Sequence, residues 1–255
     1  WSNISGGDHH GYDWIVSNGI TIGGTHTNIS NFIIPSNAIV YLDSNNPLEI
    51  HAYNITIQSG AIVNGTGKGW GPDHGPGTGG QGVGGSYGGR GGDGLVPSHA
   101  PYGSWSSFSI ENGSGGGSWT DIGGAGGGSV FLDAKSSIFI YGNIFVDGEN
   151  TYVTGSGNAD GGGSGGGILC NATNIIVKGI LSANGGNVIG ASPPVGGGGG
   201  GRIKFFYETL DINGSDIRVF GGDGENANAG DVGTIYYETI GDGTEWSNIS
   251  GGDHH

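Results

Sequence analysis

GILCNATNIIVKGILSANGG, residues 167–186, sets the pattern for this chain. The stretch contains three short apolar runs, in which hydrophobic side chains alternate with small or polar ones, and it closes on asparagine and glycine. Alternation with a period of two places one face of each run against a hydrophobic interior, as in a β-strand. The stretch therefore predicts three strands joined by tight corners.

Residues 48–65, 129–148 and 201–222 repeat this pattern. A single stretch of this length cannot bury its apolar face alone, so the copies have to stack as turns of a parallel β-solenoid. Alignment of the four copies predicts three ladders of inward-facing side chains. The ladders are Ile50, Leu132, Cys170 and Phe205; Ile57, Ile140, Val177 and Ile212; and Ile62, Ile144, Ile180 and Ile217.

Glycine-rich excursions separate the copies, at residues 65–128, 149–166, 187–200 and 223–232. They leave each turn at the same corner, so we expect them to cluster on one side of the solenoid. Glycine allows close backbone packing, and aromatic residues that can act as anchors punctuate the excursions. We expect extended, mutually hydrogen-bonded chains; the alternative is a set of flexible linkers. The anchors are Trp70, Tyr87, Tyr102, Trp105 and Trp119.

Several outward positions of the predicted strands are also apolar, namely Phe139, Ile176, Phe145 and Leu181. Strands that are apolar on both faces are usually covered on both. We expect either the glycine-rich excursions or a neighbouring subunit to supply the second cover.

The same ten residues, WSNISGGDHH, stand at 1–10 and at 246–255, which gives a period of 245 residues. This identity indicates a tandem-repeat protein, or a duplicated terminal motif used in head-to-tail assembly. We expect residues 1–245 to form one repeat unit and a single solenoid domain, and 246–255 to start the next repeat. Within the unit, 14–64 are N-terminal turns, 65–128 the first excursion and 129–240 the main turns. The chain contains no methionine, which indicates that it is part of a longer product.

The charge balance is strongly acidic, with 22 Asp and Glu against seven Lys and Arg and a formal net charge of −15. No basic patch is present to neutralise phosphates, so a nucleic-acid partner is excluded. We expect no membrane insertion in this segment, because no long apolar span occurs. The scattered acids indicate a solvated surface; calcium bound in some acidic turns is the alternative.

Asn-X-Ser/Thr triplets are more frequent than the composition predicts by chance. Each marks a potential N-glycan on a secreted protein, so we expect an extracellular, cell-surface location and N-linked glycans. The alternative is that Asn and Thr are simply common in β-turns. The eight acceptor residues are Asn3, Asn28, Asn54, Asn64, Asn112, Asn171, Asn213 and Asn248.

Two further features bear on chemistry. Asp8, His9 and His10 stand together in the repeated segment, and adjacent histidines in a loop can bind Zn²⁺ or Cu²⁺; a solvent-exposed linker is the alternative. The single cysteine, Cys170, lies in an apolar run and is expected to be a buried thiol, although an intermolecular disulfide is possible. We expect no required cofactor.

The order of six blocks resembles a family of glycine-rich, secreted β-helix repeat proteins of cell surfaces, and archaeal sheath, surface-layer or filament glycoproteins in particular. The resemblance implies a right-handed parallel β-helix and a surface or adhesive role, and it carries over no catalytic residue. The blocks are PYGS (101–104), GSGGGS (113–118), GGAGGGSVFLDA (123–134), GGGSGGGI (161–168), SANGG (182–186) and GGGGGGRIKFFY (196–207).

We therefore predict an all-β, right-handed parallel β-helix with glycine-rich excursions packed on one side. Its expected function is that of a structural subunit of an extracellular filament, sheath or coat, whose partner is another copy of itself. A surface adhesin or glycan-binding stalk is the rival. A polysaccharide-degrading enzyme is disfavoured, because such enzymes need several carboxylates together and the aligned outward positions Thr56, Phe139, Ile176 and Asp211 supply one.

Overall fold

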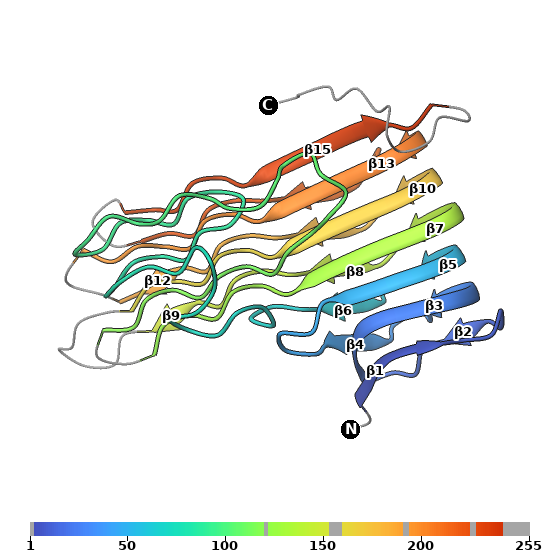
Figure 1. Cartoon of the computed structure of the whole chain (residues 1–255), viewed down its shortest axis with the longest axis horizontal. Coiled ribbons are helices and arrows are strands. Elements are labelled where there is room, and N and C mark those ends of the chain that lie inside the picture. Colours follow the sequence, from blue (N-terminus) through green and yellow to red (C-terminus); the bar gives the residue numbers. More distant parts are fainter. Residues whose placement is uncertain (1–2, 120–121, 153–159, 191–193, 225–227, 242–255) are drawn as a thin grey trace.

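The computed structural model describes residues 3–119, 122–152, 160–190, 194–224 and 228–241. These residues form an all-β fold with no helix. Thirteen strands belong to one sheet, and every strand pair in it is parallel. The sheet is strongly curled, and its strands stack along one axis (Figure 1).

A row of long strands forms the first part of the sheet, in which each strand pairs with the long strand that precedes it and the one that follows. A register shift divides β3, β5, β7 and β10 into two arms, so that the strand turns a corner without ending. The row consists of β3 (Thr21–Ile34), β5 (Leu48–Ile57), β7 (Ser129–Ile140), β10 (Gly167–Val177), β13 (Arg202–Asp211) and β15 (Thr234–Thr239).

A row of short strands forms the second part. It consists of β4 (Ile39–Leu42), β6 (Ile62–Asn64), β8 (Asn143–Phe145), β11 (Ile180–Ser182) and β14 (Asp216–Arg218). The start of β3 pairs with β4 and joins the two rows. At the N-terminal end, β1 (Asn3–Asp8) and β2 (Trp14–Ile15) pair with β3. Two short strands, β9 (Thr151–Tyr152) and β12 (Val188–Ile189), form a separate parallel pair.

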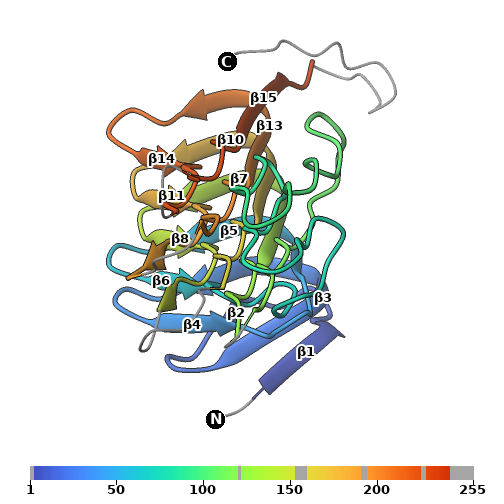
Figure 2. The ribbon, with the colours of Figure 1, turned by 90° about the vertical axis from the view of Figure 1, so that its left-hand side faces the viewer.

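The two rows face each other across the stack (Figure 2), and buried side chains from both rows form one hydrophobic core. The first predicted ladder is confirmed, because Ile50 lies beside Leu132, Leu132 beside Cys170, and Cys170 beside Phe205, and all four are fully buried. The second ladder is confirmed for three of its four members by the pairing of Ile140 with both Ile57 and Val177. Its fourth member, Ile212, follows the end of β13 and packs half-buried against the core.

The third ladder is wrong by one residue in two of its four members. Leu181 pairs with both Ile144 and Ile217, and Val63 pairs with Ile144. Ile62 and Ile180, which were expected inside, are only half-buried. The prediction that Leu181 faces outward is wrong for the same reason, because its side chain is fully buried in the core.

The glycine-rich segments lie side by side beyond the starts of the long strands (left in Figure 1). We call this region the glycine bundle, which comprises residues 82–92, 113–117, 123–128, 161–166, 183–186, 196–201, 221–224 and 228–233. Its backbone hydrogen bonds run between segments distant in sequence. The expectation of extended, mutually bonded chains on one side is thereby confirmed.

Two of the glycine runs, 161–166 and 196–201, each bond to three neighbours in rotation. Within 161–166, successive N–H groups point to three different segments, and the fourth returns to the first segment. This repeat of three matches an extended left-handed chain with three residues per turn. The acceptors of residues 161 to 166, in order, are the carbonyls of Gly117, Gly196, Glu149, Ser114, Gly199 and Val146.

The run 196–201 repeats this rotation with three other neighbours. Its N–H groups bond in order to the carbonyls of Gly82, Asn228, Gly186, Gly85, Asp231 and Ala183. Neighbouring backbones approach so closely that side chains do not fit. A Cβ at Gly198 would lie 1.9 Å from the carbonyl oxygen of Gly163, and one at Gly163 would lie 1.9 Å from that of Ala125. The bundle is therefore built of glycine because its backbones are in direct contact.

Candidate assembly interface

The two ends of the stack are the sites that bear on assembly. At the N-terminal end, β1 lies parallel to β3, with Asn3 beside Thr21 and Ile4 beside Ile22. Ile4 and Trp14 pack against the core and partly close it. Among the described strands β1 pairs with β3 alone, so its other edge faces outward.

An aromatic stack fixes β1 and β2 to β3. The indole of Trp14 contacts two imidazoles, with ring centroids 4.3 Å from His9 and 4.4 Å from His26. The imidazoles also share a hydrogen bond, with His9 Nε2 3.1 Å from His26 Nδ1, while His26 Nε2 lies 3.2 Å from the carbonyl oxygen of Gly23. If that nitrogen donates to Gly23, His26 Nδ1 is an acceptor and His9 donates to it. Burial lowers the pKa of both histidines, which favours this neutral pair.

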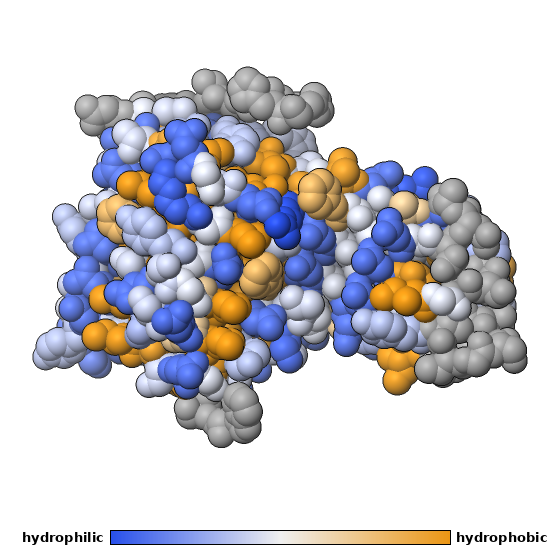
Figure 3. Space-filling model, turned by 180° about the vertical axis from the view of Figure 1, so that it is seen from behind, coloured by the Kyte–Doolittle hydropathy of each residue, from blue (hydrophilic) through white to orange (hydrophobic). Residues whose placement is uncertain are grey.

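At the C-terminal end the core is open. In the described part of the chain, β15 pairs only with β13 and β14 only with β11. A cavity of about 640 Å³ lies between the two strands, and its walls are mostly apolar. It is lined by Trp105, Ile217, Val219, Phe220, Val232, Gly233, Thr234, Ile235, Tyr236 and Tyr237. Seen from behind, hydrophobic residues also reach the surface near this end (Figure 3).

The first excursion covers the outer face of the long strands. Phe108 packs edge-on against Phe131 of β7 and Phe206 of β13, with ring centroids 5.2 and 5.1 Å apart. Trp105 packs against Tyr236 of β15 in the same way, at 5.5 Å. The residues covered in this way are not the outward apolar positions named from the sequence, of which Phe139 and Ile176 line an open groove.

Two buried cations hold the excursion in place. The Lys204 ammonium on β13 donates to the carbonyl oxygens of Ser104, Ser107 and Ser109, at 2.7, 3.0 and 2.7 Å. Burial lowers the pKa of Lys204 to about 8, so the ammonium keeps its proton at neutral pH. Arg202 donates to the carbonyl of Tyr102 at 3.0 Å.

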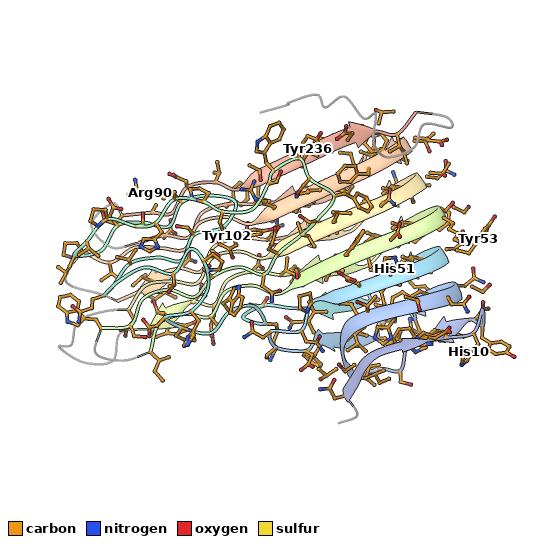
Figure 4. All side chains as sticks on the ribbon, viewed as in Figure 1. His10, His51, Tyr53, Arg90, Tyr102 and Tyr236 are labelled. Atoms are coloured by element: carbon orange, nitrogen blue, oxygen red, sulfur yellow. The ribbon has the colours of Figure 1, made fainter. Side chains whose placement is uncertain are left out.

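The expected aromatic anchors differ in their burial. Tyr87 is fully buried, with its hydroxyl donating to Glu111 at 2.8 Å and the Arg202 guanidinium over its ring. Tyr102 lies between the glycine bundle and the long strands (Figure 4), and its hydroxyl donates to the carbonyl of Asn112. Trp70 and Trp105 are partly exposed, at 38% and 45%.

The potential glycosylation sites fall into distinct classes. Asn3, Asn28 and Asn213 are exposed, whereas Asn54 and Asn64 are half-buried. Asn112 and Asn171 are buried at 7% and 4% exposure, which leaves no room for a glycan in the folded chain. Asn248 lies outside the described residues.

The three residues expected to bind a metal ion point in two different directions. Asp8 and His10 contact each other at the surface, with 3.6 Å between Oδ2 and Nδ1, while the His9 ring turns inward to Trp14. No group of three or more His, Cys, Asp or Glu side chains is arranged to hold a metal in the described ranges. Cys170 is a free thiol, fully buried in the core, and burial raises its pKa to about 12. This burial favours the structural interpretation over an intermolecular disulfide.

The alignment of the copies contains one polar cluster that sequence analysis missed. His51 Nδ1 lies 2.8 Å from Asp133 Oδ2, and the Asn171 amide donates to the other oxygen of that carboxylate at 2.6 Å. The aligned copies could have revealed this cluster, because each of the three residues directly follows a member of the first ladder.

The predicted outward row is confirmed, since Phe139 pairs with both Thr56 and Ile176, and Ile176 pairs with Asp211. The row runs along a shallow groove of about 320 Å³, in which Asp211 is the only carboxylate among the lining residues. Asp211 bonds to Lys178 at 2.8 Å.

Comparison of the chain with protein-family models, curated proteins and solved structures gives no match. No helix in the described part of the chain has the length and apolar character to cross a membrane. The function is therefore argued from the geometry alone.

Proposed function

We propose that this chain is a structural subunit of an extracellular glycoprotein filament, sheath or coat. In this proposal the stacked strands are turns of a right-handed β-helix, and units join end to end. The observation that carries it is the stack itself: one parallel sheet ends in an outward-facing strand, β1, at one end and in an open apolar core at the other. The segment that forms β1 is also the segment that occurs twice in the sequence.

The glycine bundle supports a mechanical role. The runs 161–166 and 196–201 are each tied to three neighbours by backbone hydrogen bonds, which cross-links the segments alongside the sheet. We expect this cross-linking to resist bending and sliding of the turns. A wall or fibre that carries a mechanical load needs this resistance.

Electron microscopy of the purified full chain tests the proposal. We expect fibres or sheets whose axial repeat is the length of one unit. Particles that remain single at every concentration, with the cell surface free of such an array, would contradict it.

Mass spectrometry tests the extracellular glycoprotein part separately. We expect glycans on the exposed Asn3, Asn28 and Asn213 and none on the buried Asn112 and Asn171. Protein isolated from its native source with every acceptor asparagine unmodified would remove this part of the proposal.

A surface adhesin or glycan-binding stalk is the rival, and the groove along Phe139 favours it. The rings of Phe139 and Tyr141 lie parallel with centroids 6.4 Å apart, and polar side chains including Asn174 and Asp211 line the groove. Tethered, isolated stalks on cells and loss of glycan binding in the variant Phe139→Ala would support the rival.

A further inference from the structure

The core is open at the C-terminal end and leaves apolar side chains exposed. Phe220 and Val232 at this end are 59% and 66% exposed, and the cavity they line is mostly apolar. Clustered exposed apolar side chains usually mark an interaction surface.

We propose that β1 of a second copy of this chain pairs with β15, so that both rows of the sheet continue across the junction. This inference rests on the proposed function and specifies its contact. The interface is heterologous, because one end of a unit meets the opposite end of the next. Such an interface repeats without closing and yields a filament.

Strand direction permits this pairing without any rotation of the strands. β1 runs parallel to β3, and β3 is parallel to each later long strand as far as β15. A second copy placed further along the same axis therefore presents β1 to β15 in the parallel sense. Among the described strands β15 pairs with β13 alone, and the edge of a sheet is a template for a further strand.

The ladders of the sheet set the register. Gly7 lies beside His26, which begins the ladder that runs through Ile50, Leu132, Cys170 and Phe205 to Tyr237. If β1 of the second copy pairs with β15 as β1 pairs with β3, its Gly7 lies beside Tyr237. The same register sets Ser5 of the second copy beside Thr234.

The ladders of the short-strand row independently support this placement of the second copy. Ile4 pairs with Ile22, and Ile22 with Leu42. Later turns have an equivalent residue directly after each short strand. These residues are Val146 after β8, Ala183 after β11 and Val219 after β14. Val219 lines the open cavity, so Ile4 of the second copy is the next member of this buried ladder and fills the cavity from above.

The register also predicts an unfavourable contact. Asp8 of the second copy falls beside Glu238, whose carboxylate already bonds to the Tyr236 hydroxyl. Like charges directly opposite each other on adjacent strands repel, and salt screens that repulsion. We therefore expect salt to strengthen assembly through this junction, and the variant Glu238→Gln to reduce the salt dependence of assembly.

Disulfide trapping in the full chain tests the register. Cys170 is fully buried, so the variants Ser5→Cys and Thr234→Cys each carry one accessible thiol. Neighbouring strands bring paired Cα atoms within disulfide range. We expect a mixture of the two single variants to yield a covalent dimer under oxidation, each variant alone to yield none, and the double variant to yield a ladder of oligomers.

The alternative occupant is the chain's own second WSNISGGDHH segment, in which Ser250 corresponds to Ser5. A cross-linked monomer from the double variant Thr234→Cys, Ser250→Cys, with no dimer in the mixture above, would overturn the second-copy junction. Filaments by microscopy without any Ser5–Thr234 cross-link would overturn the junction and leave the proposed function standing. Absence of any assembly would overturn both.

A variant of an exposed cavity residue provides a second readout. Val232→Asp places a carboxylate where the junction buries an apolar side chain, and burial of an unpaired charge is costly. We expect the protein concentration needed for assembly to rise about tenfold or more. Tyr53→Asp is the matched control, since Tyr53 is 56% exposed on β5 away from both ends. Equal effects of the two variants would count against the junction.

Discussion

The curled sheet and the glycine bundle hold extended chain segments together in opposite ways. In the sheet, ladders such as Ile50, Leu132 and Cys170 bury apolar side chains, and each strand bonds to neighbours on its two sides in the plane of the sheet. In the bundle, a run such as 161–166 has almost no side chains and bonds to three neighbours around it. The sheet is stabilised mainly by apolar burial and the bundle by backbone hydrogen bonds. Stability in the two regions should thus respond to different substitutions.

The largest effect is expected from a methyl group in the bundle. In Gly198→Ala the new Cβ meets the Gly163 carbonyl oxygen at 1.9 Å, and the backbone on either side cannot yield. We expect a loss of about 4 kcal/mol or more, seen as a fall in Tm of about 10 °C. Gly71→Ala is the control, because nothing lies within 4 Å of its Cβ position. Similar melting of both variants would show that the bundle tolerates side chains.

A large-to-small change in the sheet core should cost somewhat less. Leu132→Ala leaves a cavity at a fully buried position, and such changes typically cost about 2–5 kcal/mol. The control is Leu95→Ala, at a side chain that is 52% exposed. Chemical denaturation measures both, and an equal response would contradict the burial of the first ladder.

The contact between the two regions gives a third, smaller effect. Lys204→Met keeps the length of the side chain and removes the three hydrogen bonds to residues 104–109. Each hydrogen bond from a charged group is worth about 1.5–3 kcal/mol, but methionine also avoids the cost of burying an ammonium group, which offsets much of the three. We therefore expect a net loss of about 2 kcal/mol. Faster amide exchange should be confined to residues 102–111. Lys135→Met, at an exposed lysine of β7, should change neither quantity.

Acidification should have the smallest effect, confined to the N-terminal edge. The pKa of His26 is lowered from 6.5 by burial, so the fold prefers the neutral ring. Its contribution is fully present above about pH 6.5 and is lost progressively as the pH falls below that value. A proton on His26 Nδ1 would also face the N–H of His9, while Asp8 and His10 lie nearby. Amide exchange of β1 should therefore accelerate between pH 7 and 5.

The matched control for this prediction is His10→Gln, at an exposed histidine on the same segment. Amide exchange of β1 in this variant should depend on pH in the same way as in the natural sequence. Exchange of β1 that is independent of pH would show that the aromatic stack does not depend on the neutral histidine pair.

The sheet could be predicted from sequence where alternation was unambiguous. The first ladder has single inward residues between polar or outward ones, and all four members were correct. In the third ladder two aliphatic residues stand next to each other, as in Ile180 and Leu181, and alternation cannot choose between them. The length of the preceding corner decides which of the two side chains faces the core, and the sequence does not show that length.

The bundle and the end contacts were less accessible to sequence reasoning. Glycine density indicated close backbones, but glycine has no side chain to specify which run lies beside which. Lys204 bonds to carbonyls about a hundred residues away, so no local pattern reveals its role. The His9–His26 pair depends on the return of β3 beside β1, which alternation of period two also leaves undetermined.

The repeat of three in the bundle constrains how its segments can lengthen. Inserting one glycine into the run 161–166 would turn every later N–H by a third of a revolution, away from its present acceptor. Inserting three glycines would restore all directions and extend the run by about 9 Å. We therefore expect the excursions of such proteins to differ in length by multiples of three residues.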